Sequence, residues 1–246
     1  MNIKQHIPNT ITSLNLVAGV VSITLVMENQ LVWASIMIFI AAVFDYLDGT
    51  AARILQAYSE LGKQMDSLAD VVSFGVAPGI IVFKLLSVNC EGSCNVLERM
   101  HITPYFALLI PVCSALRLAK FNIDLRQEVN FIGLPTPANG LFFASIPLVL
   151  YAQPQLFSII KMEFLVDFFS NTRVLAILAV LFSYLLISDF RIFSMKVKSF
   201  SWKGNELRYV LLVSSVILLL LFSINAIPMI IVLYILLSVV FQGMIE

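Results

Sequence analysis

The sequence predicts an all-α integral membrane protein, a polytopic helical bundle of about eight spans. The first observation behind this prediction is composition. Of 246 residues, 60% are hydrophobic and only 12% are charged, whereas soluble domains carry about 25% charged residues. The second is that the apolar residues gather in segments close to the roughly 20 residues that a helix needs to cross a bilayer. A soluble domain of this length cannot bury so much apolar surface.

Apolar segments follow one another along the whole chain. They lie near residues 11–27, 31–57, 62–87, 103–123, 137–155, 171–190, 208–224 and 226–243. We expect the first span to begin near Pro8, since proline is tolerated in the first turn of a helix. The first six segments carry nearly all of the polar residues, and the last two are almost purely apolar. The sequence therefore predicts a six-helix core in residues 1–190, followed in residues 191–246 by a cytoplasmic connection and two additional transmembrane helices.

The basic residues predict how the chain is oriented. If the N-terminus faces the cytoplasm, eleven of the fifteen Lys and Arg residues lie at cytoplasmic helix ends. This is the positive-inside pattern, so we expect a multi-pass protein with both termini in the cytoplasm. A basic cytoplasmic rim suits anionic lipid head groups, and we expect membrane lipids, not a nucleic acid, as partners. Cys90 and Cys94 fall in an expected outer loop, where a disulfide can form in an oxidising compartment.

Aspartates interrupt the second and third apolar segments. Asp45 and Asp48 are three residues apart, and Asp66 and Asp70 are four apart, so each pair lies on one helix face. Because the chain turns back between the pairs, the two helices are expected to be antiparallel neighbours with their acids near the cytoplasmic ends. An ionised Asp at the centre of a membrane helix costs roughly 2.5–3.5 kcal/mol. Protonation could relieve one or two of these groups, whereas a divalent cation could neutralise all of them.

Carboxylates from two facing helices form a ligand set made of oxygen alone. Hard cations such as Mg²⁺, Mn²⁺ or Ca²⁺ suit such a set, and zinc or copper does not. Four carboxylates can also hold two ions about 3.5–4 Å apart, an arrangement that stabilises both oxygens of an in-line phosphoryl displacement. We therefore predict Mg²⁺ or Mn²⁺, as two divalent ions, bound by Asp45, Asp48, Asp66 and Asp70.

One motif contains all of these acids. It reads Asp45-x-x-Asp48-Gly49-x-x-Ala52-Arg53, then eight residues, then Gly62-x-x-x-Asp66-x-x-x-Asp70. This motif resembles the signature of the CDP-alcohol phosphotransferases, integral membrane enzymes of phospholipid head-group synthesis. All eight fixed positions are present in order, and the resemblance in fold covers the first six segments, about residues 8 to 190. It implies a cytoplasmic-facing active site and a homodimer.

The resemblance also implies roles for individual residues. Asp70 would bind metal or act as the catalytic base that takes the proton of the acceptor hydroxyl, and the other three aspartates would bind metal. The cytidine diphosphate site would be lined by Asp45, Asp48, Gly49, Ala52, Arg53, Gly62 and Asp66. The small residues are also interpretable as helix-packing residues, and Arg53 as a solvated charge at the membrane rim. Further candidates, which reach the nucleotide or else cap the first helix, are Asn9, Thr12 and Asn15.

Other stretches carry a second resemblance. They are PNTITSLNLVAG from Pro8, SFGVAPG from Ser73, RLAKFN from Arg117 and FIGLPTPANG from Phe131. Together they resemble the phosphatidylserine synthase branch of the family, the CDP-diacylglycerol–serine O-phosphatidyltransferases of bacteria and archaea. This implies that the substrates are CDP-diacylglycerol and L-serine, and that the products are phosphatidylserine and CMP. One position departs from the branch, because Asn139 stands where a small residue such as Ala is expected.

The residues that would bind serine come from the end of the fourth segment. Arg117 and Lys120 are three residues apart on one helix face, and the planar guanidinium of an arginine suits the serine carboxylate. Alternatively, both cations belong to a basic rim whose side chains extend to the membrane surface. Asn122 could donate a hydrogen bond to serine or cap the helix end.

Two other functions stay open on the sequence alone. The same chemistry could use glycerol 3-phosphate or an inositol phosphate as acceptor, although these phosphates would need more cations than Arg117 and Lys120 supply. A cation transporter is a different class, since acids within a membrane also mark ion pathways. A transporter would place its acids near the bilayer midplane, often in matching halves, whereas here they gather in one helix pair and no repeat is visible.

Overall fold

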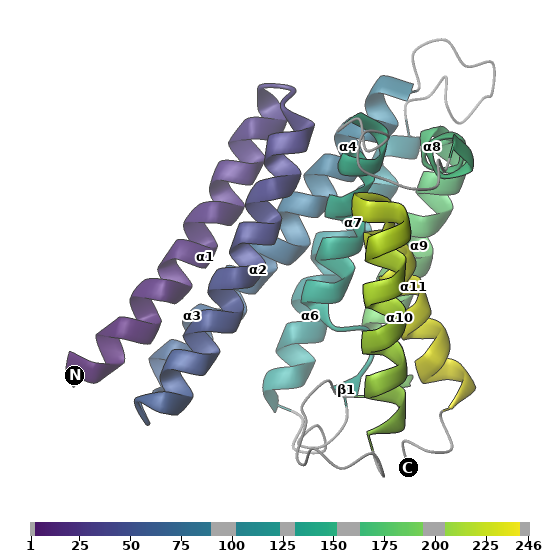
Figure 1. Ribbon diagram of the computed structural model, residues 1–246. Helices are drawn as coiled ribbons and strands as arrows, with labels where there is room; N and C mark the ends of the chain where they lie inside the picture. Colours follow the sequence, from purple (N-terminus) through teal and green to yellow (C-terminus); the bar gives the residue numbers. More distant parts are fainter. Residues whose placement is uncertain (1–2, 90–101, 124–130, 152–162, 194–204, 242–246) are drawn as a thin grey trace.

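The chain is almost entirely helical in the computed structural model, which describes residues 3–89, 102–123, 131–151, 163–193 and 205–241 (Figure 1). This confirms the all-α prediction. The elements before residue 130 are α1 (Ile3–Met27), α2 (Leu31–Ile54), α3 (Glu60–Asp70), the π-helical turn η1 (Val71–Val76), α4 (Ala77–Asn89), the 3₁₀ turn η2 (Thr103–Leu108) and α6 (Leu109–Ile123). The later ones are α7 (Thr136–Tyr151), α8 (Glu163–Ser170), α9 (Thr172–Ile187), α10 (Glu206–Phe222), η5 (Ser223–Asn225) and α11 (Ala226–Val240).

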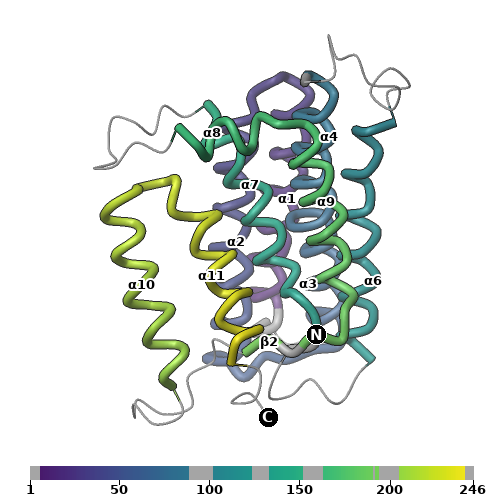
Figure 2. Tube along the Cα trace, turned by 90° about the vertical axis from the view of Figure 1, so that its right-hand side faces the viewer, coloured from purple at the N-terminus to yellow at the C-terminus, as the bar shows by residue number. Residues whose placement is uncertain are grey.

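Most of these helices are long and apolar enough to cross a membrane. Within the described residues five helical stretches meet that requirement, or six if the pair α8 and α9, bent by 79°, counts as one span. Within the described residues, each apolar segment expected from the sequence is mainly helical, and α7 is described over 16 residues. The stretch Glu206–Val240 counts once, although it reverses direction at η5 (Figure 2). The polytopic membrane fold is therefore confirmed, and the number of eight spans stays a prediction.

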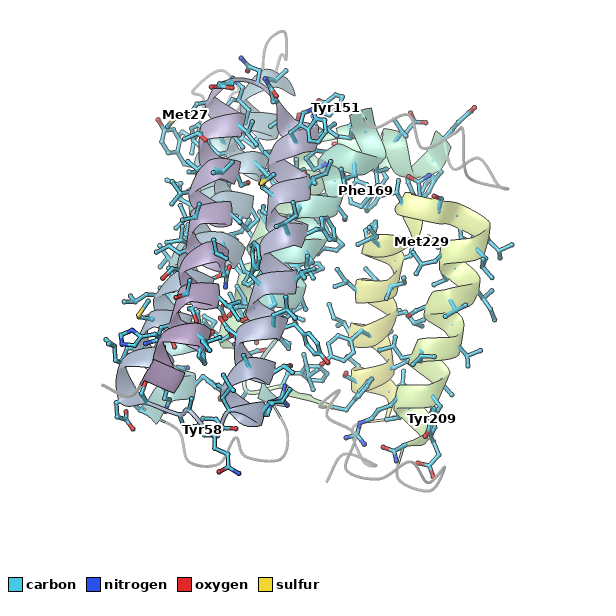
Figure 3. The ribbon with its side chains drawn as sticks, turned by 60° about the vertical axis from the view of Figure 1, so that its left-hand side comes forward. Met27, Tyr58, Tyr151, Phe169, Tyr209 and Met229 are labelled. Atoms are coloured by element: carbon cyan, nitrogen blue, oxygen red, sulfur yellow. The ribbon has the colours of Figure 1, made fainter. Side chains whose placement is uncertain are left out.

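The helices lie side by side, and the bundle has two distinct ends. Figure 3 places Tyr58 and Tyr209 at one end, and Met27 and Tyr151 at the other; we refer to the first as the Tyr58 end. Helix α1 begins at Ile3, ahead of its expected start. It packs along both α2 and α3, whereas α2 and α3 hardly touch each other directly. They run in opposite directions as predicted (Figure 1), but their separation leaves room for a cleft between them.

Small residues let the polar α3–η1–α4 stretch pack closely against its neighbours. A Cβ on Gly19 of α1 would lie 2.9 Å from the Cα of Ser73, and a Cβ on Gly75 would lie 3.0 Å from the Cβ of Ser114 in α6. A Cβ on Gly79 would lie 2.8 Å from a ring carbon of Pro111. Helices in a membrane associate through such small-residue contacts, because lipid tails provide no hydrophobic drive between helices. This close packing explains why the SFGVAPG stretch has glycines at positions 75 and 79.

Gly140 of α7 offers a direct test of that packing. A Cβ there would lie 2.8 Å from the Cα of Phe74 and 2.9 Å from its carbonyl oxygen, so the backbone itself would have to move. We expect Gly140→Ala to destabilise the protein by about 2 kcal/mol, seen as a lower unfolding temperature in detergent. Gly49→Ala is the matched control, since a Cβ at Gly49 meets nothing within 4 Å and alanine favours a helix. Equal unfolding temperatures for the two variants would contradict the close packing.

Two short strands, which we call the β hook, join the segment before α7 to the segment after α9. Strand β1 (Phe131–Ile132) pairs antiparallel with β2 (Arg191–Ile192). Gly133 follows β1 with φ +75°, a backbone conformation that favours glycine, and its N–H donates to the carbonyl of Phe190 at 2.8 Å. Two-residue strands leave no periodic pattern in a sequence, so the hook was not predicted.

The two C-terminal helices form a hairpin at the side of the bundle (Figure 2). Helix α11 packs against α7 and β2, and α10 packs mainly on α11. A cavity of about 860 Å³ lies between the hairpin and α7–α9, with an almost wholly apolar lining that includes Phe142, Phe169 and Met229. Figure 3 labels Phe169 of α8 and Met229 of α11. The expected disulfide partners Cys90 and Cys94 lie outside the described residues.

Candidate active site

Three carboxylates converge between α2 and α3. One oxygen from each of Asp45, Asp48 and Asp66 lies within 4.8 Å of the other two. Within the described chain, Oδ2 of Asp48 and Oδ1 of Asp66 are buried and have no hydrogen-bond partner. Burying a carboxylate without a donor or counter-charge is costly. A divalent cation offers the missing charge, and oxygen ligands alone suit a hard ion, so these residues fit a metal site.

Asp70 lies one helical turn beyond Asp66 and outside the group of three. Its side chain is 7% exposed and accepts a hydrogen bond of 3.3 Å from Nδ2 of Asn15. It also interacts electrostatically with Asp45. The structure thus separates the four predicted ligands into a group of three and one deeper acid.

The backbone around Asp70 is shaped by a π-helical turn. Helix α3 ends at Asp70 and η1 begins at the next residue. Such wide turns are rare in proteins overall, but many of those that occur lie at functional sites. From this turn Ser73 donates to the carbonyl of Asn15 at 3.0 Å. Asn15 is therefore bound to the π turn through its backbone and to Asp70 through its amide, which fixes the direction of the carboxylate.

A cleft of about 740 Å³ opens beside the three acids. Its lining includes seven of the ten residues predicted to bind the diphosphate nucleotide, namely Asn9, Thr12, Asp48, Gly49, Ala52, Gly62 and Asp66. Gly49 leaves open space where a side chain would project. Ser59 caps α3 by accepting from the N–H of Gly62 at 3.0 Å, so the positive end of the α3 dipole faces this cleft.

The other three predicted nucleotide residues do not line the cleft. Asn15 and Asp45 belong to the layer that surrounds Asp70. Arg53 is exposed and folds back along its own helix, where Nε donates to the carbonyl of Gly49 at 3.0 Å and Nη2 donates to Thr50 at 3.2 Å. The four-residue spacing allows this local bond, so in this structure Arg53 reaches neither an acid nor the cleft lining.

Sequence reasoning missed several lining residues. The remaining ones are Pro8, Ala57, Tyr58, Ser59, Glu60, Lys63 and Phe121. Lys63 is the most informative, because it brings an exposed positive charge to a cleft that is otherwise acidic. Its position directly after the glycine of the motif was the available signal. Tyr58 and Ser59 lie in the α2–α3 connection, for which spacing arguments make no prediction.

Arg117 is buried within electrostatic range of Asp70. Its side chain is 6% exposed, so the rim interpretation does not fit this residue. Nη1 donates to Oγ1 of Thr136 at 3.2 Å, the guanidinium lies 5.8 Å from the ring centroid of Phe121, and Asp70 is an electrostatic partner. Thr136, at the start of α7, is a further site residue that sequence reasoning missed.

Lys120 and Asn122 differ from Arg117. Lys120 is exposed, as a residue of a basic rim would be. Asn122 donates from Nδ2 to Oγ of Ser67 at 2.9 Å, so it ties α6 to α3 next to Asp66 and is engaged by the protein itself. Of the three predicted serine ligands, Arg117 is the one that is buried and has Asp70 as an electrostatic partner.

All of the site residues named above lie within the part of the chain that matches a known family. A match to the family described as CDP-alcohol phosphatidyltransferase extends over residues 5–185. The chain belongs to the CDP-alcohol phosphatidyltransferase family. This family depends on divalent metals in general, in agreement with the three converging carboxylates. The match ends within α9, so the α10–α11 hairpin lies beyond it.

Curated members of the CDP-alcohol phosphatidyltransferase family resemble the chain over a shorter region. The CDP-diacylglycerol–serine O-phosphatidyltransferase of Mycobacterium leprae is 39% identical over 145 residues, which is 56% of this chain and 45% of that protein. The protein of the same name from Bacillus subtilis is 33% identical over 141 residues, 56% of this chain and 72% of that protein. The archaetidylserine synthase of Methanothermobacter thermautotrophicus is 35% identical over 141 residues, 56% of each. The chain thus spans about half the length of the mycobacterial and archaeal relatives.

Proposed function

We propose that the protein is a CDP-diacylglycerol–serine O-phosphatidyltransferase, which transfers the phosphatidyl group of CDP-diacylglycerol to the hydroxyl of L-serine and releases CMP. The relatives named for serine transfer support this acceptor. The observation that carries the proposal is the buried Arg117 within electrostatic range of Asp70. One guanidinium beside a candidate base provides one place for a carboxylate next to a reacting hydroxyl.

The chain's acids would hold the metal and the diphosphate. Asp45, Asp48 and Asp66 would bind Mg²⁺ or Mn²⁺, and we propose two ions, with Asp70 as a further ligand or as the base. A bound divalent ion neutralises charge on the diphosphate and on the departing phosphate oxygen. The cleft residues of α1 and α2 would hold the cytidine diphosphate, with Lys63 near its negative charge.

The transfer itself requires one proton to move. Asp70 would take the proton of the serine hydroxyl, whose oxygen then forms a bond to the β-phosphorus of CDP-diacylglycerol. The bond from that phosphorus to the bridging oxygen breaks, and its electron pair leaves with CMP. Asn15 supports this role, because its amide holds the Asp70 carboxylate in one direction.

Arg117 would bind the serine carboxylate, and Thr136 would hold one arm of its guanidinium. Lys120, which is exposed, would attract the anionic group toward the site, and Asn122 would act through Ser67. A phosphate-bearing acceptor such as glycerol 3-phosphate would need several cations, and among the described residues Arg117 is the buried cation at Asp70.

We also propose an orientation and an assembly. The active site and both termini would face the cytoplasm, which the cations Arg53, Lys63, Lys120 and Arg208 at the Tyr58 end support by the positive-inside rule. We further propose that residues 1–190 form the core and that residues 191–246 are an addition to it. We also propose that the protein is a homodimer.

Acceptor profiling tests the proposed function. With CDP-diacylglycerol and labelled serine, the purified protein is expected to form phosphatidylserine and CMP in equal amounts. Ethanolamine, which lacks the carboxylate, is expected to react at least about 10-fold more slowly, since one charged hydrogen bond is lost. The products are separated by thin-layer chromatography. Turnover of glycerol 3-phosphate or an inositol phosphate without turnover of serine would end the serine proposal and keep the family chemistry.

A further inference from the structure

The C-terminal helix contributes a buried tyrosine to the neighbourhood of Arg117. Tyr234 of α11 is 8% exposed. Its hydroxyl donates to the carbonyl of Phe193 at 2.9 Å, and its ring meets the Phe193 ring edge-on with centroids 5.0 Å apart. This tyrosine lies beyond the family match, so the shared family pattern does not account for it.

The segment that Tyr234 holds leads back to the site. Phe193 directly follows β2, and β2 pairs with β1. After β1 a further backbone hydrogen bond holds the chain against α9, because the N–H of Leu134 donates to the carbonyl of Leu185 at 2.9 Å. Two residues later α7 begins at Thr136, which accepts from Arg117. The β hook therefore connects Tyr234 to the hydrogen-bond partner of Arg117.

Tyr234 also lies within electrostatic range of the Arg117 guanidinium. At neutral pH its phenol is uncharged, so it acts on the cation as a dipole. Because the phenol O–H donates its hydrogen bond to the Phe193 carbonyl, its oxygen offers only lone pairs to other groups, and lone pairs attract a nearby cation. Within the described chain Nε of Arg117 has no hydrogen-bond partner, so Thr136 alone does not fix the rotation of the planar group.

We propose that Tyr234 is a positioning residue, which holds Arg117 in the orientation that binds the carboxylate of the acceptor amino acid. This inference rests on the proposed function, because it requires an acceptor with a carboxylate. It gives the α10–α11 hairpin a part in acceptor selection, whereas an added pair of packing helices would have none.

The test is Tyr234→Phe, which removes the hydroxyl and keeps the ring in its packing. The KM for serine is expected to rise about three- to tenfold, the size of one lost hydrogen bond, and the KM for CDP-diacylglycerol is expected to stay unchanged. Ser238→Ala is the matched control, since it also removes a buried hydroxyl from α11, one that donates to the carbonyl of Tyr234 in its own helix. Its KM for serine should equal that of the wild type.

Several results would overturn the inference. An unchanged KM for serine in Tyr234→Phe, an equal rise in the KM for CDP-diacylglycerol, or the same rise in Ser238→Ala would each show a merely structural role. A low yield of folded Tyr234→Phe protein that still has a wild-type KM for serine would do so too. Wild-type protein that does not use serine would instead reject the proposed function, so the two failures are distinguishable.

Discussion

Asp70→Asn is expected to lower kcat by at least about 100-fold, the usual contribution of a general base, while the protein keeps its fold. Asparagine has nearly the same shape as aspartate but cannot take a proton from the serine hydroxyl. The buried side chain at this position accepts from Asn15, and an amide oxygen can accept the same bond. The change therefore removes the basic group and leaves the surrounding packing intact. The measurement is CMP release from CDP-diacylglycerol at saturating serine.

Asp189→Asn is the control for this experiment, because Asp189 is exposed and undergoes the same chemical change. It should keep wild-type turnover. The unfolding temperature of Asp70→Asn should not fall below that of the wild type, since the variant buries one charge fewer. If Asp70→Asn retained more than about a tenth of wild-type kcat, Asp70 would not be the base, because such a loss is smaller than the 10²- to 10⁴-fold usual for this role.

The aspartates show how far helical spacing alone can locate a site. The three- and four-residue intervals predict two acidic faces, and the structure brings three of those carboxylates within 4.8 Å. The intervals do not show that α2 and α3 stand apart with α1 packed on both. They also miss the π turn that begins after Asp70, because a π turn changes the backbone hydrogen-bond pattern without leaving a mark in the hydropathy.

The two arginines show where the local sequence pattern fails to identify a site residue. Arg53 and Arg117 both lie near the predicted ends of apolar segments, yet one folds back on its own helix and the other is buried. What distinguishes them is the tertiary partner, since Thr136 and Tyr234 approach Arg117 only through α7 and α11. Contacts between residues so distant in sequence cannot be inferred from the local pattern of one chain.

Asp48→Asn is expected to abolish turnover, with a loss of about 100-fold or more, because even the groups that orient metal ligands contribute about 10- to 100-fold. The same variant makes a second prediction that does not depend on activity. Without metal, the wild type holds three carboxylates close together with two buried oxygens unpartnered in the described chain. Replacing Asp48 relieves like-charge repulsion, so in chelator the variant should unfold at a higher temperature than the wild type.

Divalent ions should reverse that order of stability. An ion that binds the folded state raises stability by RT ln(1 + [L]/Kd), about 2.7 kcal/mol at 100 times Kd. Titration with Mn²⁺ should therefore raise the unfolding temperature of the wild type and of the control Asp167→Asn, whose exposed carboxylate lies in α8. Asp48→Asn should respond weakly. Chelator should stop wild-type turnover until Mg²⁺ or Mn²⁺ is restored. Equal Mn²⁺ stabilisation of Asp48→Asn and the wild type would remove Asp48 from the ion site, and turnover in chelator would remove metal from the reaction.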